Sequence, residues 1–211
     1  MGATAGSSNS GREARAGEAG TVNRETVVAE GDVAIRRMRD DDDDYRLMVS
    51  WRNQPHVRHW WDPDLPPLDL SAAREEYRPD TLPDAPSTAC FIERDGMPVG
   101  FIQFYRWSSY ADEAREVGIP FDPHTWGMDI FVGEASETGR GLGPKALDLL
   151  CRHLHTAHGA SAVALTVDLN NDVAIRSYRK AGFESIERVL DLDTRGGERV
   201  ESWLMMRRLE Q

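Results

Sequence analysis

The chain has 211 residues, a formal net charge of −11 at neutral pH and a sequence pI near 5.0. This length accommodates one domain with a substantial core, and the negative charge argues against nucleic acid as the main partner. No apolar run approaches the length of a membrane span and the N-terminus lacks a signal-peptide core, so we expect a cytoplasmic protein without a membrane partner.

The N-terminal segment is expected to be a disordered tail. Residues 1–28 contain almost no large apolar side chains and cannot bury enough surface to offset their ordering entropy, which leaves 29–211 as the domain. Residues 33–38 predict a first strand. The acidic run 40–44 could suggest a metal site, but adjacent carboxylates are better explained as caps of a helix over 43–52.

The next stretch predicts a loop, a helix and a hairpin. The Pro-rich loop 53–67 carries Trp60 and Trp61, which either pack onto the core or line a ligand cleft. A helix over 70–78 begins at Asp69 or Ser71. Strands 88–93 and 97–105 flank an Asp-Gly pair, which is a strong indicator of a hairpin.

A long loop is predicted over residues 106–124. It mixes aromatic residues with carboxylates, including Asp122, and loops of this length in compact domains are usually functional or disordered. The composition fits either a binding wall for a polyamine or amino sugar, or a solvated acidic loop.

A β-α-β unit follows, made of strand 127–132, helix 143–158 and strand 162–168. The crossover helix makes the two strands parallel. Asp129 lies in the middle of the first strand, and Asp168 lies at the carboxyl end of the second, where open α/β sheets bind ligands. A helix over 171–182 and strands over 184–191 and 199–207 complete the domain.

The two cysteines are predicted to be core residues. Cys90 and Cys151 lie in apolar contexts, on a predicted strand and a predicted helix. No metal-ligand spacing accompanies them, so we expect reduced thiols and no metal.

Closely spaced glycines precede the helix of the β-α-β unit. Residues 139–143 read Gly-Arg-Gly-Leu-Gly, a composition that lets backbone N–H groups turn toward one point. At a helix N-terminus such a loop attracts phosphate, although an ordinary tight turn would have the same composition.

Two motifs resemble the GCN5-related N-acetyltransferase (GNAT) family. The first is Thr138-x-x-Gly141-x-Gly143, where the family usually has Gln or Arg in place of Thr138. The second begins at Asn171 and continues through Tyr178 to Gly-Phe at 182–183. The resemblance implies a single α/β (α+β) domain with a mixed sheet of about six to seven strands. It also implies acetyl-CoA between splayed parallel strands four and five, with no metal, held by Phe131, Val132, Thr138, Gly139, Arg140, Gly141, Leu142, Gly143, Asn171 and Tyr178.

The resemblance narrows to the aminoglycoside 6′-N-acetyltransferases, which confer resistance or self-protection. It rests on Gly-Met-Asp-x-Phe at 127–131, the tryptophan pair, Gln103 with Tyr105, and Asp-Pro at 122–123. The middle of the 106–124 loop departs from the pattern in length and sequence. The implied residues facing a cationic amino sugar are Asp122, Asp129, Asp168, Trp60, Trp61, Gln103 and Tyr105.

Acetyl transfer to an amine assigns roles to these residues. Asp129 is the expected base, with a pKa raised by neighbouring Asp122 and Asp168 until the polycation binds, unless it is a structural cap or ion-pair partner. The N–H groups of Phe131 and Val132 would face the thioester oxygen.

Tyr178 would protonate the thiolate or only pack against acetyl-CoA. Alternatives are a siderophore-pathway enzyme acetylating a lysine-type amine and a non-catalytic acyl-CoA-binding module. The expected assembly is a monomer or homodimer.

Overall fold

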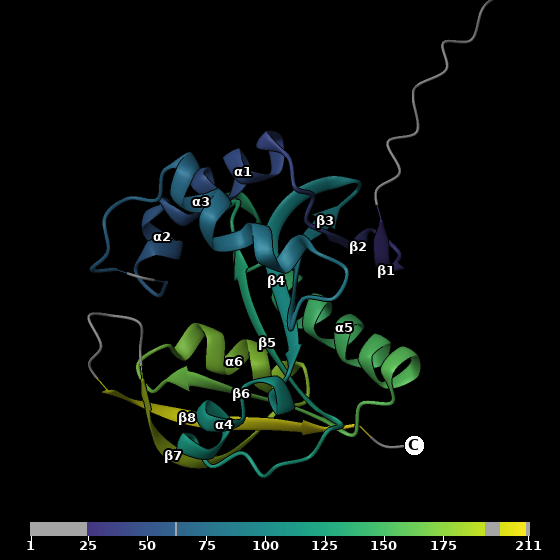
Figure 1. Cartoon of the computed structure of the whole chain (residues 1–211), viewed down its shortest axis with the longest axis vertical. Coiled ribbons are helices and arrows are strands. Elements are labelled where there is room, and N and C mark those ends of the chain that lie inside the picture. Colours follow the sequence, from purple (N-terminus) through teal and green to yellow (C-terminus); the bar gives the residue numbers. More distant parts are fainter. Residues whose placement is uncertain (1–24, 62, 193–198, 210–211) are drawn as a thin grey trace, which may run out of the picture.

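The computed structural model describes residues 25–61, 63–192 and 199–209. These residues form one mixed eight-stranded sheet with the order β1-β2-β3-β4-β5-β6-β8-β7 (Figure 1). The strands are β1 Thr26–Glu30, β2 Val33–Arg37, β3 Ser87–Arg94, β4 Met97–Arg106, β5 Thr125–Val132, β6 Ala162–Asp168, β7 Glu184–Leu192 and β8 Arg199–Arg208.

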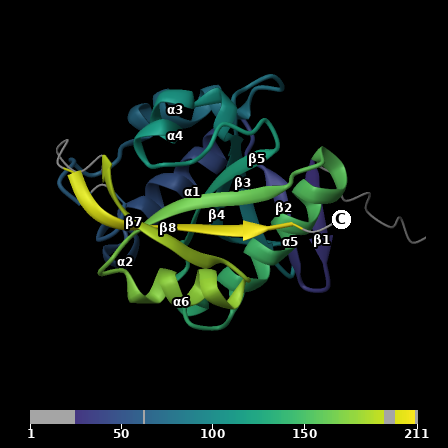
Figure 2. The ribbon, with the colours of Figure 1, turned by 90° about the horizontal axis from the view of Figure 1, so that it is seen from below.

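Helices cover both faces of the sheet. Figure 2 shows α3 and α4 on one face and α5 and α6 on the other. The helices are α1 Asp42–Arg52, α2 Pro55–Arg58, α3 Leu70–Tyr77, α4 Ala111–Glu116, α5 Leu142–His158 and α6 Asp172–Lys180, with 3₁₀ turns η1 Arg78–Thr81, η2 Trp107–Ser109 and η3 Ala135–Glu137. The predicted fold class and β-α-β unit are confirmed.

Local sequence rules account for several element boundaries. The hairpin between β3 and β4 turns at Asp95 and Gly96, with φ angles of 50° and 76°, as its Asp-Gly pair predicts. Asp41 caps α1 by accepting a hydrogen bond from the Asp44 N–H, and Asp69 caps α3. The acidic run before α1 therefore acts as a helix start, as predicted.

Three sequence predictions require correction. The first is the strand count: β1 adds an eighth strand and begins at Thr26, inside the predicted tail. Its backbone pairs with β2, and Val27 and Val28 pack on the core, so two valines suffice once a neighbouring edge is available. Residues 1–24 lie outside the described residues.

The other two corrections concern the predicted loops. The 53–67 loop contains α2, and the 106–124 loop contains η2 and α4. Helix α4 forms because Ala114 and the following Val117 and Ile119 pack on Ala164 and Leu204 of the sheet. Tertiary packing thus orders a stretch whose own sequence pattern indicates a loop.

The largest cluster of buried apolar residues lies between the sheet and α5. It contains both cysteines, each fully buried and free, as predicted. A second cluster joins α1 and α3 to β3 and β4, and a third lies under α4. Among the described residues, none of the helices is both long and apolar enough to cross a membrane.

Strands β5 and β6 separate soon after they meet. Within residues 125–168, all described, they pair only at Thr125 with Ala162 and at Trp126 with Val163. Strand β5 remains paired with β4 as far as Val132, and β6 remains paired with β8. The predicted parallel pair is therefore splayed, and the remainder of β5 and β6 borders a gap that begins after Trp126.

Candidate active site

Asp129 lies on β5 beyond the point where β6 diverges. Its cross-strand partner on β4 is Gln103, whose Nε2 donates a 2.7 Å hydrogen bond to Asp129 Oδ2. The Asp129 side chain is partly buried. Gln103 therefore orients the Asp129 carboxylate from the adjacent strand. The resemblance had implied that Gln103 contacts the substrate instead.

The environment of Asp129 favours its protonated form. Burial raises the pKa of Asp129, the Gln103 bond opposes this rise, and the charge of Asp191 adds to it. Asp191 lies on β7, where the Thr166 hydroxyl of β6 donates to it. The expectation that Asp122 and Asp168 would raise this pKa was wrong, because the nearby carboxylate is Asp191.

Aromatic rings form one side of this site. Tyr105 pairs across the strands with Gly127, and a Cβ added at Gly127 would lie 2.3 Å from the Tyr105 ring. The ring centroids of Trp107 and Tyr110 lie 5.3 and 5.1 Å from that of Tyr105, both in edge-on geometry. Gly127 thus provides the space in which the Tyr105 ring lies against β5.

Tyr178 reaches the same site from α6. It is 7% exposed and packs on Phe183 of the following turn, with ring centroids 5.7 Å apart. Burial raises the pKa of Tyr178, and the charge of Asp129 raises it further. The phenol is therefore a neutral O–H donor at physiological pH, near the carboxylate expected to accept a proton.

The glycine loop leaves the start of α5 open. Gly139 and Gly141 have φ angles of 71° and 78°, which favour glycine, and a Cβ at either would meet nothing within 4 Å. Of the described helices with eight or more residues, α1, α3 and α6 have side-chain caps, whereas no side chain caps α5 at Gly141. The first N–H groups of α5 are thus available to an anion.

The remaining loop residues contribute in different ways. Thr138 Oγ1 donates to Ala135 O at 2.7 Å, and Arg140 pairs with Glu137 at 2.9 Å. Leu142 is buried and anchors the helix start.

The loop also meets α6 at close range. A Cβ at Gly143 would lie 2.8 Å from Ser177 Oγ, so glycine permits close approach of α6. Asn171 caps α6 by accepting from the Ala174 N–H at 3.1 Å.

Replacement of Gly141 by Asp should weaken acetyl-CoA binding sharply, because it places a negative charge at an anion-binding helix start. Gly141→Asn has nearly the same size without the charge and should retain more affinity. The measurement is calorimetric titration of each folded variant. Gly159→Asp, at the left-handed C-cap of the same helix, controls for backbone strain. Equal affinity in the Gly141→Asp and wild-type proteins would contradict the assignment.

The two other predicted substrate carboxylates differ in their placement. Asp122 lies just before β5, at its paired end, and accepts hydrogen bonds from His124 N, Thr125 Oγ1 and Ser161 Oγ. These bonds tie together the segments leading into β5 and β6, which is a structural role. Asp168 lies at the carboxyl end of β6 and accepts from the Asn170 N–H at 2.7 Å.

The two tryptophans differ in how they pack. The Trp61 ring packs onto the core, with its centroid 5.0 Å from that of Phe131 and 6.0 Å from that of Phe101. Trp60 is partly buried and lies edge-on to His59, with ring centroids 4.5 Å apart. Trp61 therefore supports the second core cluster, and both partly buried tryptophans remain candidates for a cleft wall.

Phe131 and Val132 lie where β5 borders the gap. The Phe131 side chain stacks on Phe101 at 5.3 Å, away from the α5 face, and Val132 packs toward the core under α5. Backbone N–H groups along a strand alternate between its two sides. Gly133 N donates to Val99 O of β4, so the Phe131 N–H also points toward β4 and the Val132 N–H points toward the gap. The predicted oxyanion contact is therefore possible for the Val132 N–H but not for the Phe131 N–H.

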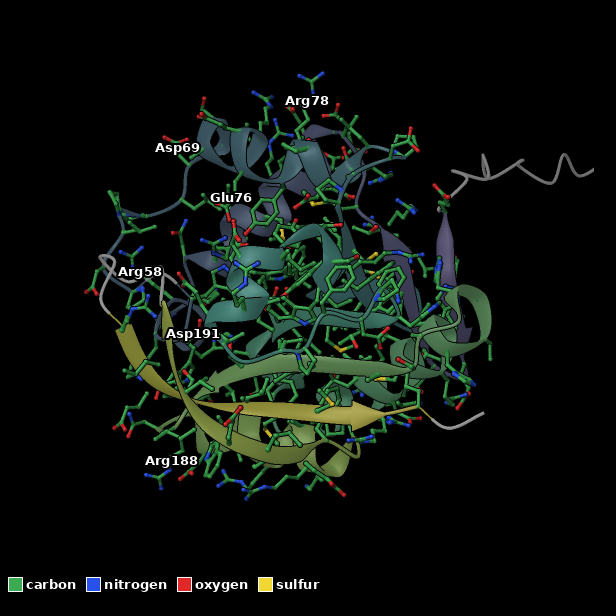
Figure 3. All side chains as sticks on the ribbon, turned by 60° about the horizontal axis from the view of Figure 1, so that its bottom comes forward. Arg58, Asp69, Glu76, Arg78, Arg188 and Asp191 are labelled. Carbon is green, nitrogen blue, oxygen red and sulfur yellow. The ribbon has the colours of Figure 1, made fainter. Side chains whose placement is uncertain are left out.

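Two site residues, Asp191 and Thr166, were not predicted from the sequence, and Tyr110 is one of the aromatic residues of the 106–124 loop. Asp191 lies on β7, and Figure 3 shows it below the labelled Glu76 of α3. Burial raises the pKa of Tyr110, with the charges of Asp80, Glu113 and Asp129 adding to the rise. The alternation of Val189 and Asp191 on β7 indicates that they share a face, but not that this face meets Asp129.

The sequence of residues 40–190 matches a family model described as an acetyltransferase (GNAT) domain. The chain belongs to the GNAT acetyltransferases. This membership confirms the family resemblance and the splayed-strand fold. The described residues of this GNAT domain contain no group of three or more His, Cys, Asp or Glu side chains that could hold a metal ion.

Several GNAT proteins are similar to this chain. Aminoglycoside N(6′)-acetyltransferase type 1 of Klebsiella pneumoniae is 26% identical over 163 residues, which cover 77% of this chain and 80% of that protein. AAC(6′)-Ib solved with ribostamycin and coenzyme A is 27% identical with a TM-score of 0.73, covering 84% of this chain and 94% of that one. Spermine/spermidine N(1)-acetyltransferase of Bacillus subtilis is 32% identical over 90 residues, or 43% of this chain and 55% of that protein.

Proposed function

We propose that the protein transfers an acetyl group from acetyl-CoA to the 6′-amine of an aminoglycoside, in the cytoplasm, giving resistance or self-protection. The observation that carries the proposal is Asp129, a partly buried carboxylate oriented by Gln103 beside the β5–β6 gap. The similar proteins named above include one solved with an aminoglycoside and coenzyme A. The net charge of −11 favours a polycationic substrate.

The residues present fit acetyl-CoA as co-substrate. The N–H groups of Gly139 to Gly143 would hold the pyrophosphate, since α5 has no side-chain cap and both left-handed glycines face open space. Arg140 is exposed at this loop and would lie on the phosphate side. The gap between β5 and β6 would accept the extended arm that carries the thioester.

The chemistry requires the acceptor nitrogen to lose two protons and the departing sulfur to gain one. Asp129 accepts a proton from the substrate ammonium, directly or through water, which leaves a neutral amine. The amine nitrogen then forms a bond to the thioester carbon, whose oxygen would accept a hydrogen bond from the Val132 N–H. The carbon–sulfur bond breaks, and the Tyr178 hydroxyl donates its proton to the departing thiolate. The second proton leaves the acceptor nitrogen as the amide forms and returns through water to the Tyr178 phenolate.

Asp191 and Tyr110 extend the site beyond Asp129. The Thr166 hydroxyl donates a hydrogen bond to the Asp191 carboxylate, and the negative charge of Asp191 raises the pKa of Asp129. A substrate ammonium near both carboxylates would lower the pKa of Asp129 and offset its burial. This arrangement would favour cations over neutral amines.

A matched pair of antibiotics tests the regiochemistry. Neomycin and paromomycin differ only in an amine or a hydroxyl at the 6′ carbon, so neomycin should be acetylated at 6′ and paromomycin should not. Product is identified by mass spectrometry and NMR, and CoA release gives the rate. Rising salt should increase KM, because charge attraction is screened. Equal turnover of the two compounds would contradict 6′ acetylation.

A polyamine is the second candidate acceptor. The spermine/spermidine acetyltransferase similarity covers 43% of the chain, and a linear polycation would satisfy the same carboxylates. Spermine and a lysine-type siderophore precursor therefore belong in the same assay. Preference for spermine over neomycin by kcat/KM would move the assignment to polyamines, and acetyl-CoA binding without turnover of any amine would favour a non-catalytic module.

A further inference from the structure

The side chain of Trp107 meets the sheet where β5 and β6 part. The last β5–β6 pair is Trp126 with Val163, and the next residue on β6 is Ala164. The Trp107 indole N–H donates a 2.9 Å hydrogen bond to the Ala164 carbonyl. An indole from the 106–124 segment therefore binds the β6 backbone one residue beyond the end of the β5–β6 ladder.

This indole is firmly held. Trp107 is 8% exposed and lies in the cluster under α4, together with Ala164, Leu204 and Ile119. A buried indole with a satisfied N–H and packed faces has little freedom to move. The width of the gap at its closed end is therefore fixed by a side chain as well as by the strand ladder.

Trp107 also contacts the site through Tyr105. The two rings meet edge-on at 5.3 Å, and Tyr110 contacts the Tyr105 ring at 5.1 Å. Gly127 leaves no Cβ on the β5 side, so the ring lies directly against β5, two residues from Asp129. Burial raises the pKa of Tyr105 and the charge of Asp129 contributes, which agrees with this proximity.

We propose that Trp107 is a positioning residue for acetyl transfer: its indole holds β6 at the closed end of the gap and fixes the Tyr105 ring beside Asp129. The proposal rests on acetyl transfer at Asp129, as proposed above. Trp107 contacts neither the proposed acetyl-CoA loop nor Asp129 directly. Its effect is therefore on the alignment of the acceptor amine and on the solvation of the carboxylate, through Tyr105.

The test compares Trp107→Phe with wild type. Phenylalanine keeps an aromatic ring in the cluster but removes the N–H that binds Ala164 O. Misplacement of a positioned group by about 1 Å can cost on the order of a hundredfold in rate, so a roughly tenfold drop in kcat is expected for this partial change. Acetyl-CoA affinity by calorimetry should be unchanged, because the glycine loop lies at the other end of β5.

An NMR titration of the Asp129 carboxyl supplies a readout that does not depend on turnover. A displaced Tyr105 ring would let water reach Asp129 in Trp107→Phe, so its titration midpoint should move to lower pH. The other titratable groups that face Asp129 are Asp191, Tyr105, Tyr110 and Tyr178, and none of them is substituted in this variant. The titration remains decisive even if the acceptor proves not to be an aminoglycoside.

Trp203→Phe is the matched control. Trp203 lies on β8 and packs on the opposite face of the sheet, in the cluster under α5 and α6. A lower kcat and a lower Asp129 midpoint in Trp107→Phe, but not in Trp203→Phe, would support the proposal. It would be overturned by an unchanged midpoint, by kcat within twofold of wild type, or by equal losses in both variants.

Discussion

Replacement of Asp129 by Asn should lower kcat by about a hundredfold or more at neutral pH, the usual scale for loss of a general base. Asparagine keeps the size of the side chain and can still bond to Gln103, but it cannot take a proton. Acetyl-CoA affinity should remain near the wild-type value, because the glycine loop lies beyond the end of β5. Steady-state kinetics with CoA release, combined with calorimetry for acetyl-CoA, measures both quantities.

The pH profile separates a base from an anchor. The pKa of Asp129 is raised, so the wild-type rate should fall as pH decreases through that raised pKa, where the carboxylate becomes protonated. The Asp129→Asn rate should lack this limb and recover partly at high pH, where free amine is present without a base. Asp148→Asn, on α5, removes a carboxylate that pairs with Arg152 and Arg207 and serves as control.

Three outcomes of the Asp129→Asn experiment lead to different conclusions. A near-wild-type kcat at neutral pH would show that Asp129 is not the base. A higher acceptor KM with unchanged kcat would make Asp129 an ammonium anchor and leave proton removal to water. A loss of acetyl-CoA affinity equal to the loss of kcat would indicate a structural role for Asp129 on β5.

Patterns of short range were sufficient to predict much of this fold. The β-α-β unit follows from alternation on β5 and β6 and from the apolar face of α5, and the helix starts follow from Asp41 and Asp69. The glycines at 139 and 141 also act locally, since their left-handed φ angles are properties of the loop itself. Each of these features depends on neighbours within a few positions in the chain.

The parts that were not predicted depend on contacts distant in sequence. Asp191 lies on β7, and its effect on Asp129 requires the β6-β8-β7 strand order, which the sequence does not state. Trp107 is an ordinary loop aromatic until its indole meets Ala164, 57 positions away. Helix α4 likewise depends on packing against the sheet rather than on its own periodicity. Asp191, Trp107 and α4 were therefore not predicted, because the contacts that define them join residues far apart in the chain.

Asp122 is the opposite case: the resemblance predicted a substrate contact, but the hydrogen bonds of Asp122 indicate a structural role. A carboxylate before a core strand suggested a substrate contact, but its oxygens accept hydrogen bonds from His124, Thr125 and Ser161. The same bonds lower the pKa of Asp122, the backbone bond from His124 first. A carboxylate satisfied in this way stabilises the junction of two segments and is poorly placed to bind an ammonium near Asp129.

The second large effect expected concerns stability, at the ion cluster between β2, β3 and α1. Arg36, which is 2% exposed, donates to Asp44 at 2.6 and 2.9 Å and to Glu93 at 2.8 Å. Arg39 also donates to Asp44, at 2.9 Å. Asp44→Ala leaves Arg36 buried with one carboxylate fewer, so the free energy of unfolding should fall by about 3 kcal/mol, the scale for breaking a buried pair. Urea denaturation at neutral pH measures this change.

A control and a pH series test this assignment. Asp42 forms exposed pairs with Arg46 and Arg74, so Asp42→Ala should cost about 1 kcal/mol or less. Burial alone would raise the pKa of Asp44, but the bonds from Arg36 and Arg39 outweigh it and lower the pKa below its ordinary value of 3.8. The stabilisation is therefore present above that value and is lost as pH falls through the lowered native pKa. The difference in unfolding free energy between wild type and Asp44→Ala should shrink in acid, and a difference that stays constant down to low pH would show that the charge of Asp44 is not what stabilises this cluster.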